Sequence, residues 1–500
     1  MLTPSFSYTP PEMTAEQKAR LERYLARQKG HGPAEPSALP GLMQRPQRAT
    51  NPPAPGSLAE PQGLELDEEA ASAGAPPAVP GTFRILNNRA LAPTFSSSDV
   101  NEPSHANAGR YVWYVGNWYA ARSTNKGATW TYVNPAADFQ DFCCDQDVIY
   151  DSGRNILLWY RQGIASSDGT NNIRLGVSRN GGASWIQYNI TFSNYANLPA
   201  GWFDYPHLAL SNNYLYITSN YFNPSNTFQR MILTRIPLDQ LLAGGAIGWT
   251  WWSTTSGWAW TPVQGARNVM YVGDHLSNTS FRICSQPEAN TALNCSSVAV
   301  PAWTWTPRGT ASCIAPNGLN PCARLDHRIN AGYLKEDESA NRHELGFFWT
   351  VAQGAGFPFP YVNALAVDAS TLAPLPGARA RPLIWTTSAA WVYAGAAPNA
   401  RGALGIATWL IGGGVYPQLY VGIDDDYNGF PPGWQVAFVA ASNGVVGNRW
   451  GDYVRVRMHS PDGNTWSASG HVTVNGTQQP RYVNFGRERD MNGYLRFRLQ

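Results

Sequence analysis

The sequence predicts an all-β fold built from a series of small, similar sheets. Charged residues make up only 14% of the 500-residue chain, which contains 47 Gly, 38 Pro and 20 Trp. Such a composition is rich in turns and aromatic residues and is not that of a helical protein. A second observation is a turn that recurs. Residues 123–130 and 178–185 share the order Ser, Asn, Gly, then Thr or Ser, then Trp.

The recurring turn has the chemistry of a hairpin end. The amide side chains of Asn125 and Asn180 can bind backbone N–H groups of their own turns, and the glycine that follows each of them permits a positive φ. The closing Trp then packs the hairpin onto its neighbour. Residues 460–466 are a shortened third copy, and residues 253–260 are a degenerate fourth. The chain therefore repeats one hairpin design.

These turns resemble the Asp-box, or BNR repeat, of the sialidase-like β-propellers, with Asn125 and Asn180 where the family usually has Asp. The resemblance is local to the turns and their flanking strands. It implies a β-propeller, whose Asp-boxes lie at blade hairpins away from the active face. It implies a fold more strongly than it implies an activity.

The first 80 residues differ in character from the rest. Residues 14–28 carry a capping box, Thr14 with Gln17, and apolar residues at helical spacing, which predicts one short helix. Residues 29–80 are rich in Pro, Ala, Gly and Glu and predict a mobile linker. We expect residues 1–80 to form an N-terminal arm and residues 81–500 to form the propeller. No signal peptide is visible in residues 1–11.

From residue 81 onward, polar openings followed by alternating strands recur about every 40 to 60 residues, as propeller blades do. We count seven blades. Six is the alternative, because the fourth (249–284) and the sixth (around 403–423) are weakly marked. Residues 82–86 and 494–499 alternate like strands and are expected to pair in one blade, which would close the ring. The clear openings are at Glu102, Asp145, Tyr205, Asp326 and Trp450.

The six cysteines fall into three close groups. One pair, Cys284 and Cys295, and another, Cys313 and Cys322, each bracket a short loop, while Cys143 and Cys144 are adjacent. Loops bracketed in this way predict disulfides and an oxidising, extracellular or periplasmic compartment. Cys143 and Cys144 can form a vicinal disulfide.

Overall charge and hydropathy narrow the range of partners. The net charge of +2 gives no reason to expect nucleic acid or an anionic membrane. No apolar run approaches the length that spans a bilayer. We expect a monomer whose partner is a carbohydrate or polysaccharide.

The predicted site lies where the inner strands begin, because in a propeller these starts surround the mouth of the central channel. Asp145 and Asp147 are two residues apart in a strand, so both should point to one face and suit general acid and base chemistry. So many carboxyls close together should raise at least one pKa or share a cation. The candidate catalytic residues are Glu102, Asp145, Asp147, His207, Asp326 and Tyr453, and the candidate substrate-binding residues are His327, Arg328 and Asp452.

The resemblance also implies what a sialidase would need, which is an Arg-Ile-Pro motif and three arginines. Residues 83–85 resemble the motif, but Leu86 replaces the Pro, and only Arg174, Arg328 and Arg455 come into consideration. We therefore expect a different glycoside hydrolase, or a polysaccharide lyase with His207 or Tyr453 as base and Arg328 as the cation. The alternative is a non-catalytic propeller that binds a glycan or protein as part of a larger assembly.

No cofactor is required by this chemistry, but two metal sites come into question. Asp424, Asp426 and Asn428 carry oxygen ligands at the spacing of half a calcium loop. The flanks look like strands, so the segment is either a calcium-binding blade loop or a plain acidic turn. His105, His207 and His327 all lie near blade openings and could together hold a metal on the ring axis.

Overall fold

The computed structural model describes residues 1–8, 65–66, 81–91, 102–337, 342–425, 434–448, 450–452 and 454–491. Within these ranges helical structure is limited to one short helix, α2 (Leu238–Ala243), and three 3-10 turns: η2 (Phe192–Asn194), η4 (Gly377–Ala380) and η5 (Glu488–Met491). The all-β prediction is confirmed. The predicted helix over 14–28 lies outside the described residues. Over the part of the chain that is described, no helix has the length and apolar character needed to cross a bilayer.

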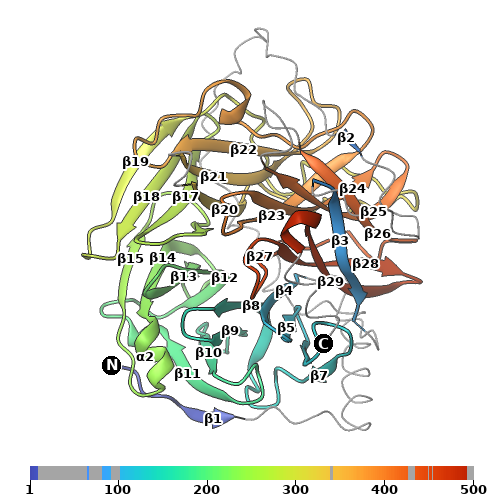
Figure 1. The fold of residues 1–500 in the computed structure, drawn as a ribbon. Coiled ribbons are helices and arrows are strands. Elements are labelled where there is room, and N and C mark those ends of the chain that lie inside the picture. Colours follow the sequence, from blue (N-terminus) through green and yellow to red (C-terminus); the bar gives the residue numbers. More distant parts are fainter. Residues whose placement is uncertain are drawn as a thin grey trace.

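The strands form small sheets set around a common centre (Figure 1). The first strand of each group lies innermost, and each inner strand contacts the next in the order β4, β8, β12, β16, β20, β23 and β27. The series closes where β28 contacts β4. This closed, radial arrangement is that of a β-propeller.

The first three sheets are antiparallel, and each takes four consecutive strands from the chain. The first contains β4 (Ser104–Ala108), β5 (Tyr111–Val115), β6 (Ala120–Ser123) and β7 (Thr131–Val133). The second contains β8 (Phe142–Asp151), β9 (Ile156–Gly163), β10 (Asn172–Ser178) and β11 (Trp185–Thr191). The third contains β12 (Trp202–Leu210), β13 (Tyr214–Phe222), β14 (Phe228–Pro237) and β15 (Thr250–Thr254).

The next strands belong to one seven-stranded sheet, in which the parallel pair β16 and β20 joins two antiparallel groups. The first group contains β16 (Thr261–Gln264), β17 (Val269–Ser277), β18 (Ser280–Pro287) and β19 (Asn294–Ala299). The second contains β20 (Ile329–Asp337), β21 (Arg342–Val351) and β22 (Tyr361–Asp368). The predicted fourth blade, 249–284, is wrong at its start, because residues 250–254 are the outer strand of the third sheet.

Two further sheets complete the ring, and each includes a strand from the N-terminal part of the chain. One contains β23 (Ala390–Pro398), β24 (Leu404–Gly412), β25 (Val415–Asp424), β26 (Gln435–Ala441) and β2 (Glu65–Leu66). The other contains β27 (Val456–Met458), β28 (Trp466–Val474), β29 (Thr477–Arg487) and β3 (Phe83–Ala90). The inner strand β23 was not predicted, because it is apolar and has no polar opening.

Strand β3 closes the ring by pairing with β29, so that Phe83 faces Arg487 and Ile85 faces Phe485. This confirms that residues 82–86 belong to the C-terminal sheet. The expected partner segment, 494–499, lies outside the described residues. The observed partner of β3 is β29, which precedes residues 494–499 in the chain.

The first eight residues, which the sequence assigned to the arm, extend the second sheet. Strand β1 (Phe6–Tyr8) runs antiparallel to β11. The Ser5 amide donates a hydrogen bond of 2.6 Å to the Gln187 carbonyl oxygen, and Leu2 bridges to Ile247. This segment therefore adds an outer strand to a sheet of the ring.

The two recurring turns are equivalent in structure as well as in sequence. Each joins the third and fourth strands of its sheet. Asn125 Oδ1 accepts the Thr129 N–H at 2.9 Å, and Ser123 Oγ accepts the Gly127 N–H at 2.8 Å. The turn at 178–185 repeats this pattern with Asn180 and Ser178, at 2.9 Å in both bonds. The other two copies differ in place: residues 460–466 join β27 to β28, and residues 253–260 lie between two sheets.

The sheets pack through aromatic side chains and are linked locally by disulfides. Trp113 of the first sheet packs against Trp159 and Trp185 of the second, with ring centres 5.0 and 4.8 Å apart. All three predicted disulfides are present: Cys143–Cys144, Cys284–Cys295 and Cys313–Cys322. The second of these joins facing residues of β18 and β19.

Candidate active site at the mouth of the ring

Three inner strands bend as they begin. The pairing register shifts near the start of β8, β12 and β23. At each shift one residue other than glycine has a positive φ, namely Cys144 at 53°, Tyr205 at 53° and Tyr393 at 58°. Such conformations cost roughly 1–3 kcal/mol and gather at functional sites, and bulges re-aim neighbouring side chains. The strained residues therefore indicate that a functional site lies at the end of the ring where these strands begin.

Five carboxyl groups and one guanidinium gather there, at or just before the inner strands. We call this set the acidic cup. Two of the carboxyls, those of Asp145 and Asp204, belong to residues that are only half-buried, whereas Glu102 is 1% exposed. The cup consists of Glu102, Asp145, Asp204, Asp326, Asp452 and Arg328.

The carboxyl of Asp145 has a strongly raised pKa. Burial, together with the nearby carboxylates of Asp204 and Asp452, raises its pKa to about 8, although a hydrogen bond with Glu102 opposes the rise. Burial also raises the pKa of Glu102 well above its ordinary range. The Asn117 amide donates to Glu102 Oε2 at 2.8 Å. The carboxyl of Asp145 is therefore protonated at neutral pH.

Asp204 is held in a different way. Burial raises its pKa, but hydrogen bonds from the Gln162 amide, 3.3 Å away, and from the Tyr205 N–H favour the ionised form, as does the charge of Arg328. The carboxylate of Asp204 is in turn one of the causes that raise the pKa of Asp145. The pKa values of the two half-buried carboxyls of the cup are therefore both raised, with burial as the main cause.

Arg328 is fixed by two carboxylates and an aromatic ring. Its Nε donates to Asp326 Oδ1 at 2.8 Å, and its Nη2 lies 3.0 Å from Asp452 Oδ1. Its guanidinium carbon lies 4.5 Å from the centre of the Tyr205 ring. Arg328, the residue before β20, thereby contacts Tyr205 within β12 and Asp452, which precedes β27, and its charge is already compensated.

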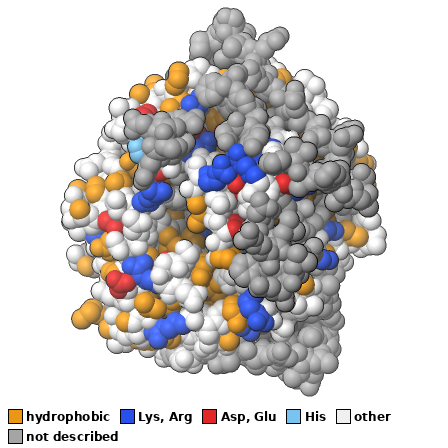
Figure 2. All heavy atoms as spheres, in the orientation of Figure 1, with side chains coloured by type: hydrophobic (Ala, Val, Ile, Leu, Met, Phe, Trp, Pro, Cys, Tyr) orange, Lys and Arg blue, Asp and Glu red, His pale blue; other side chains and the backbone are white. Residues whose placement is uncertain are grey.

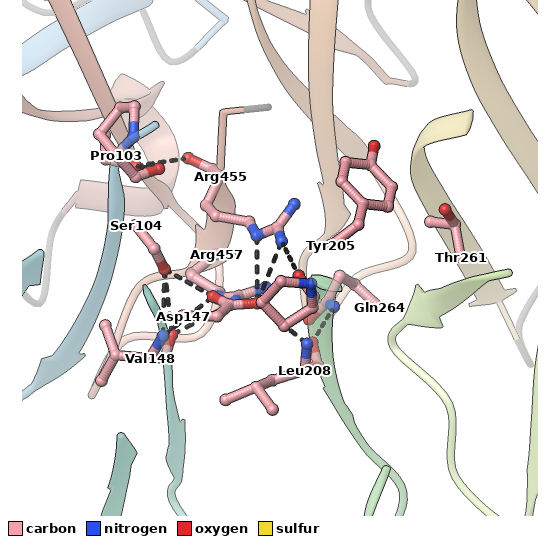
Figure 3. Close-up of polar contacts among 12 residues, drawn as sticks. Pro103, Ser104, Asp147, Val148, Tyr205, Leu208, Thr261, Gln264, Arg455 and Arg457 are labelled. Carbon is pink, nitrogen blue, oxygen red and sulfur yellow. Dashed lines mark hydrogen bonds and ion pairs between the residues drawn. The ribbon is translucent and has the colours of Figure 1, made fainter. Parts of the chain in front are cut away.

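Asp147 lies deeper along β8 and forms a separate cluster with arginines of the last sheet. Its oxygens accept bonds from Ser104 Oγ at 2.6 Å and from the Leu208 N–H at 2.9 Å. Figure 3 shows the guanidinium groups of Arg455 and Arg457 converging on this carboxylate, at 3.1 and 2.9 Å. Burial raises the pKa of Asp147, but the two arginines and the hydrogen bonds outweigh it and lower the pKa.

The expected pairing of Asp145 with Asp147 is therefore wrong. The bulge between Phe142 and Gln146 breaks the simple alternation on which the expectation relied. Asp145 hydrogen-bonds with Glu102, whereas Asp147 is an ionised, fully buried partner of two arginines. Asp147 supports the floor of the cup and has no proton to give.

The remaining predicted residues are scattered. His207 is buried and packs edge-to-face on Tyr205. His327 Nδ1 bonds with the Thr306 carbonyl oxygen at 2.8 Å and lies against Trp305. His105 Nε2 bonds with Ser467 Oγ. The three histidines therefore have separate partners and do not form the axial metal site that was considered. Tyr453 lies outside the described residues.

Of the three residues considered for calcium, the structure describes Asp424 alone, so the calcium site stays a prediction. Asp424 Oδ2 lies 2.9 Å from the Lys335 ammonium, while Asp426 and Asn428 fall outside the described ranges. No group of three or more His, Cys, Asp or Glu side chains suited to a metal ion occurs among the described residues.

The three arginines considered for a sialidase lie in three networks. Arg174 lies 3.7 Å from Asp138, Arg328 binds Asp326 and Asp452, and Arg455 binds Asp147. They do not surround one point. Sequence reasoning missed Asp204, Tyr205 as a packing partner of Arg328, and Tyr393. These three residues share one feature: each lies beside a β-bulge. The sequence alone does not show where the bulges occur.

No protein-family model matches the sequence, and no curated protein matches it. Several solved structures are similar. An α-L-arabinofuranosidase from Fusarium graminearum matches at a TM-score of 0.41 and 10% identity, over 81% of this chain and 98% of its own. A Penicillium chrysogenum α-L-arabinanase matches at 0.38 and 12%, over 81% and 98%. A Trypanosoma rangeli sialidase matches at 0.35 and 10%, over 66% and 53%. Similarities at this level do not bear on the activity of this chain.

Proposed function

We propose that the protein is a glycoside hydrolase whose catalytic site is the acidic cup. The observation that carries the proposal is the half-buried Asp145, whose pKa is raised to about 8 next to an ionisable Asp204. Glycoside hydrolysis requires one carboxylic acid to protonate the leaving oxygen and one carboxylate to act as base or nucleophile. Asp145 suits the first role and Asp204 the second.

The buried residues of the cup would then hold these two groups in place. Glu102 bonds with Asp145 and holds its carboxyl in place, while Arg328 fixes Asp326 and Asp452 around the mouth. The Tyr393 hydroxyl is buried and has no hydrogen-bond partner among the described residues. Burial raises the pKa of this hydroxyl well above its ordinary range, and the nearby carboxylate of Asp452 adds to the rise.

A polysaccharide lyase fits less well. Such an enzyme needs a cation to neutralise a uronate carboxylate, and Arg328 is already engaged by two carboxylates. His207, the base considered for this reaction, is only 3% exposed. The residues of the cup therefore favour a hydrolase over a lyase.

Further proposals concern the blades, the recurring turns and the compartment. We propose a propeller of seven blades, obtained by dividing the seven-stranded sheet at its parallel β16–β20 pair, and we propose that the turns at 123–130 and 178–185 are Asp-boxes. Three disulfides support an oxidising, extracellular setting. Charged side chains on the face seen in Figure 2 lie in separate groups among apolar and neutral ones, which suits a neutral glycan.

The test is a screen of the purified protein against neutral and acidic polysaccharides, with reducing ends and unsaturated-uronate absorbance both followed. We expect new reducing ends from a neutral glycan without uronate absorbance. Uronate absorbance would identify a lyase. Glycan binding without any cleavage would identify the non-catalytic recognition propeller and overturn the proposal.

A further inference from the structure

The disulfide between Cys143 and Cys144 lies directly before Asp145, the proposed acid. Its two Cα atoms are 3.7 Å apart, because the bond joins residues that are adjacent in the chain. A disulfide that closes a long loop stabilises a fold mainly by restricting the unfolded chain. The Cys143–Cys144 disulfide closes only a small ring around one peptide bond, so its main effect is on the local backbone.

The disulfide is part of the bulge at the start of β8. Strand β9 has one residue, Gln162, between the partners of Phe142 and Gln146, whereas β8 has three residues there, 143–145. Cys144 has a positive φ of 53°, which is unfavourable for a residue other than glycine. A bulge changes the direction in which neighbouring side chains point, and the side chain that follows the disulfide is that of the proposed acid.

Both ends of the bulge are fixed to the core. Cys143 is 8% exposed and belongs to an apolar cluster against which Cys144 also packs. Gln146 is anchored by hydrogen bonds: its Nε2 donates to the Tyr119 carbonyl oxygen at 3.0 Å, and its Oε1 accepts from Trp159 Nε1 at 2.9 Å. The proposed acid therefore lies between two anchored segments, while its own carboxyl reaches the acidic cup.

The position of Asp145 determines which groups act on its carboxyl. These titratable groups lie on other elements: Glu102, Asp204, Arg328, Asp452 and, on β9, Tyr160. Burial and two nearby carboxylates raise the pKa of Asp145, whereas the hydrogen bond with Glu102 and the guanidinium lower it. A shift of the backbone at the bulge would reduce the burial and lengthen these distances, so the pKa would move toward its ordinary value.

We propose that the Cys143–Cys144 disulfide is a positioning element of the active site, because it fixes the bulge that holds Asp145 in the acidic cup. This inference rests on the proposed function only in taking Asp145 as the catalytic acid. The disulfide acts through Asp145 and takes no part in the chemical step. Opening it lets the bulge relax and moves the carboxyl away from its partners.

The test compares wild type with a variant that carries both Cys143→Ala and Cys144→Ala, using urea unfolding at pH 5 and pH 9. In wild type the unfolding equilibrium constant should rise between these pH values, because folded Asp145 retains its proton. The variant should lose the same part of this rise that Asp145→Asn loses. The measurement needs no substrate, so it tests the positioning role even if the protein cleaves no glycan.

Turnover gives a second readout if the protein is a hydrolase. The variant should lose about 100-fold in kcat, as expected for a misplaced catalytic group, with little change in KM. Its kcat/KM should also decline from a lower pH than that of wild type.

The matched control carries Cys284→Ala and Cys295→Ala, which open the disulfide between β18 and β19. This control should keep the wild-type pH dependence. If the variant without the Cys143–Cys144 disulfide also keeps it, the proposal is overturned and the disulfide only supports the fold, whatever its effect on overall stability.

If that variant does not fold, reduction of the folded wild type replaces it. Dithiothreitol converts the disulfide to thiols and is itself oxidised to a cyclic disulfide. Alkylation and mass spectrometry of a sample identify the opened bonds, and the control with Cys284→Ala and Cys295→Ala is reduced in parallel. Loss of the pH dependence once Cys143 and Cys144 are thiols supports the proposal, and an unchanged pH dependence overturns it.

Discussion

Arg457 Nη2 lies 2.9 Å from Asp147 Oδ1, although 310 residues separate the two in sequence. The contact joins β27, in the sheet that closes the ring, to β8 in the second sheet, across the ring axis. Both side chains are at least nine-tenths buried. This ion pair and that of Arg455 with the same carboxylate thus link the last part of the ring to one of the first, beneath the acidic cup.

Replacing Asp147 by Asn should destabilise the fold by about 3–5 kcal/mol, because two buried guanidinium groups lose their compensating charge. Urea unfolding measures this change. The matched control is Asp239→Asn, since Asp239 is 81% exposed in its pair with Arg154 and should have little effect. Equal, small losses of stability in both variants would show that the buried ion pair contributes no more stability than the exposed one.

The recurring turns give a second prediction. Asn125→Ala and Asn180→Ala each remove side-chain bonds to the turn backbone and should lower stability by about 1 kcal/mol. Asp at either position keeps the acceptor oxygen and should be tolerated. Thermal unfolding of the four variants checks this, and a loss at only one of the two turns would argue against their equivalence.

Deletion of residues 1–8 should lower the stability, because β1 pairs with β11 and Ser5 bonds to Gln187. A few net backbone hydrogen bonds amount to about 1–3 kcal/mol. The sequence alone assigned these residues to an N-terminal arm outside the propeller. Calorimetry of the full chain and the truncated chain distinguishes the two views: an unchanged Tm supports the earlier one.

Asp145 makes stability and activity depend on pH in a defined window. Its pKa is about 8 in the folded chain against an ordinary 3.8, so the folded state retains a proton that the unfolded state has lost between these values. The contribution of Asp145 to the free energy of unfolding therefore falls as pH rises through this window and levels off above about 8.

The kcat/KM of the proposed hydrolase should also decline above about pH 8, as the acid loses its proton. Comparing urea unfolding at pH 5 and pH 9 checks the stability part, with Asp145→Asn as the variant that lacks this contribution. A wild-type protein and an Asp145→Asn variant with the same pH dependence would contradict the assigned pKa.

The sequence predicted the fold class and much of the cup for identifiable physical reasons. Glu102, Asp326, Arg328 and Asp452 are polar residues that precede strands, and Asp145 lies near the start of β8. Inner strands that start at the same end bring such residues together. Hairpin turns are local, so their chemistry is visible in a few consecutive residues. These features depend on short-range patterns.

The missed features depend on long-range geometry. Asp204 and Tyr393 lie at bulges, where a register shift changes which side chains face the mouth, and no local pattern in Phe203-Asp204-Tyr205 announces it. Strand β23 is apolar on both faces because neighbouring sheets cover it. Arg457 pairs with Asp147, which lies 310 residues earlier in the chain.

The measurement that tests the account most directly is kcat/KM on the best glycan of the screen for wild type, Asp145→Asn, Asp204→Asn and Asp239→Asn. Asp239 is 81% exposed, follows β14 at the end of the third sheet opposite the start of β12, and serves as control. Losing a general acid costs about 100-fold or more. We therefore predict that the first two variants fold but lose at least that factor, while Asp239→Asn remains active. Folded Asp145→Asn and Asp204→Asn proteins with wild-type turnover would contradict a catalytic acidic cup.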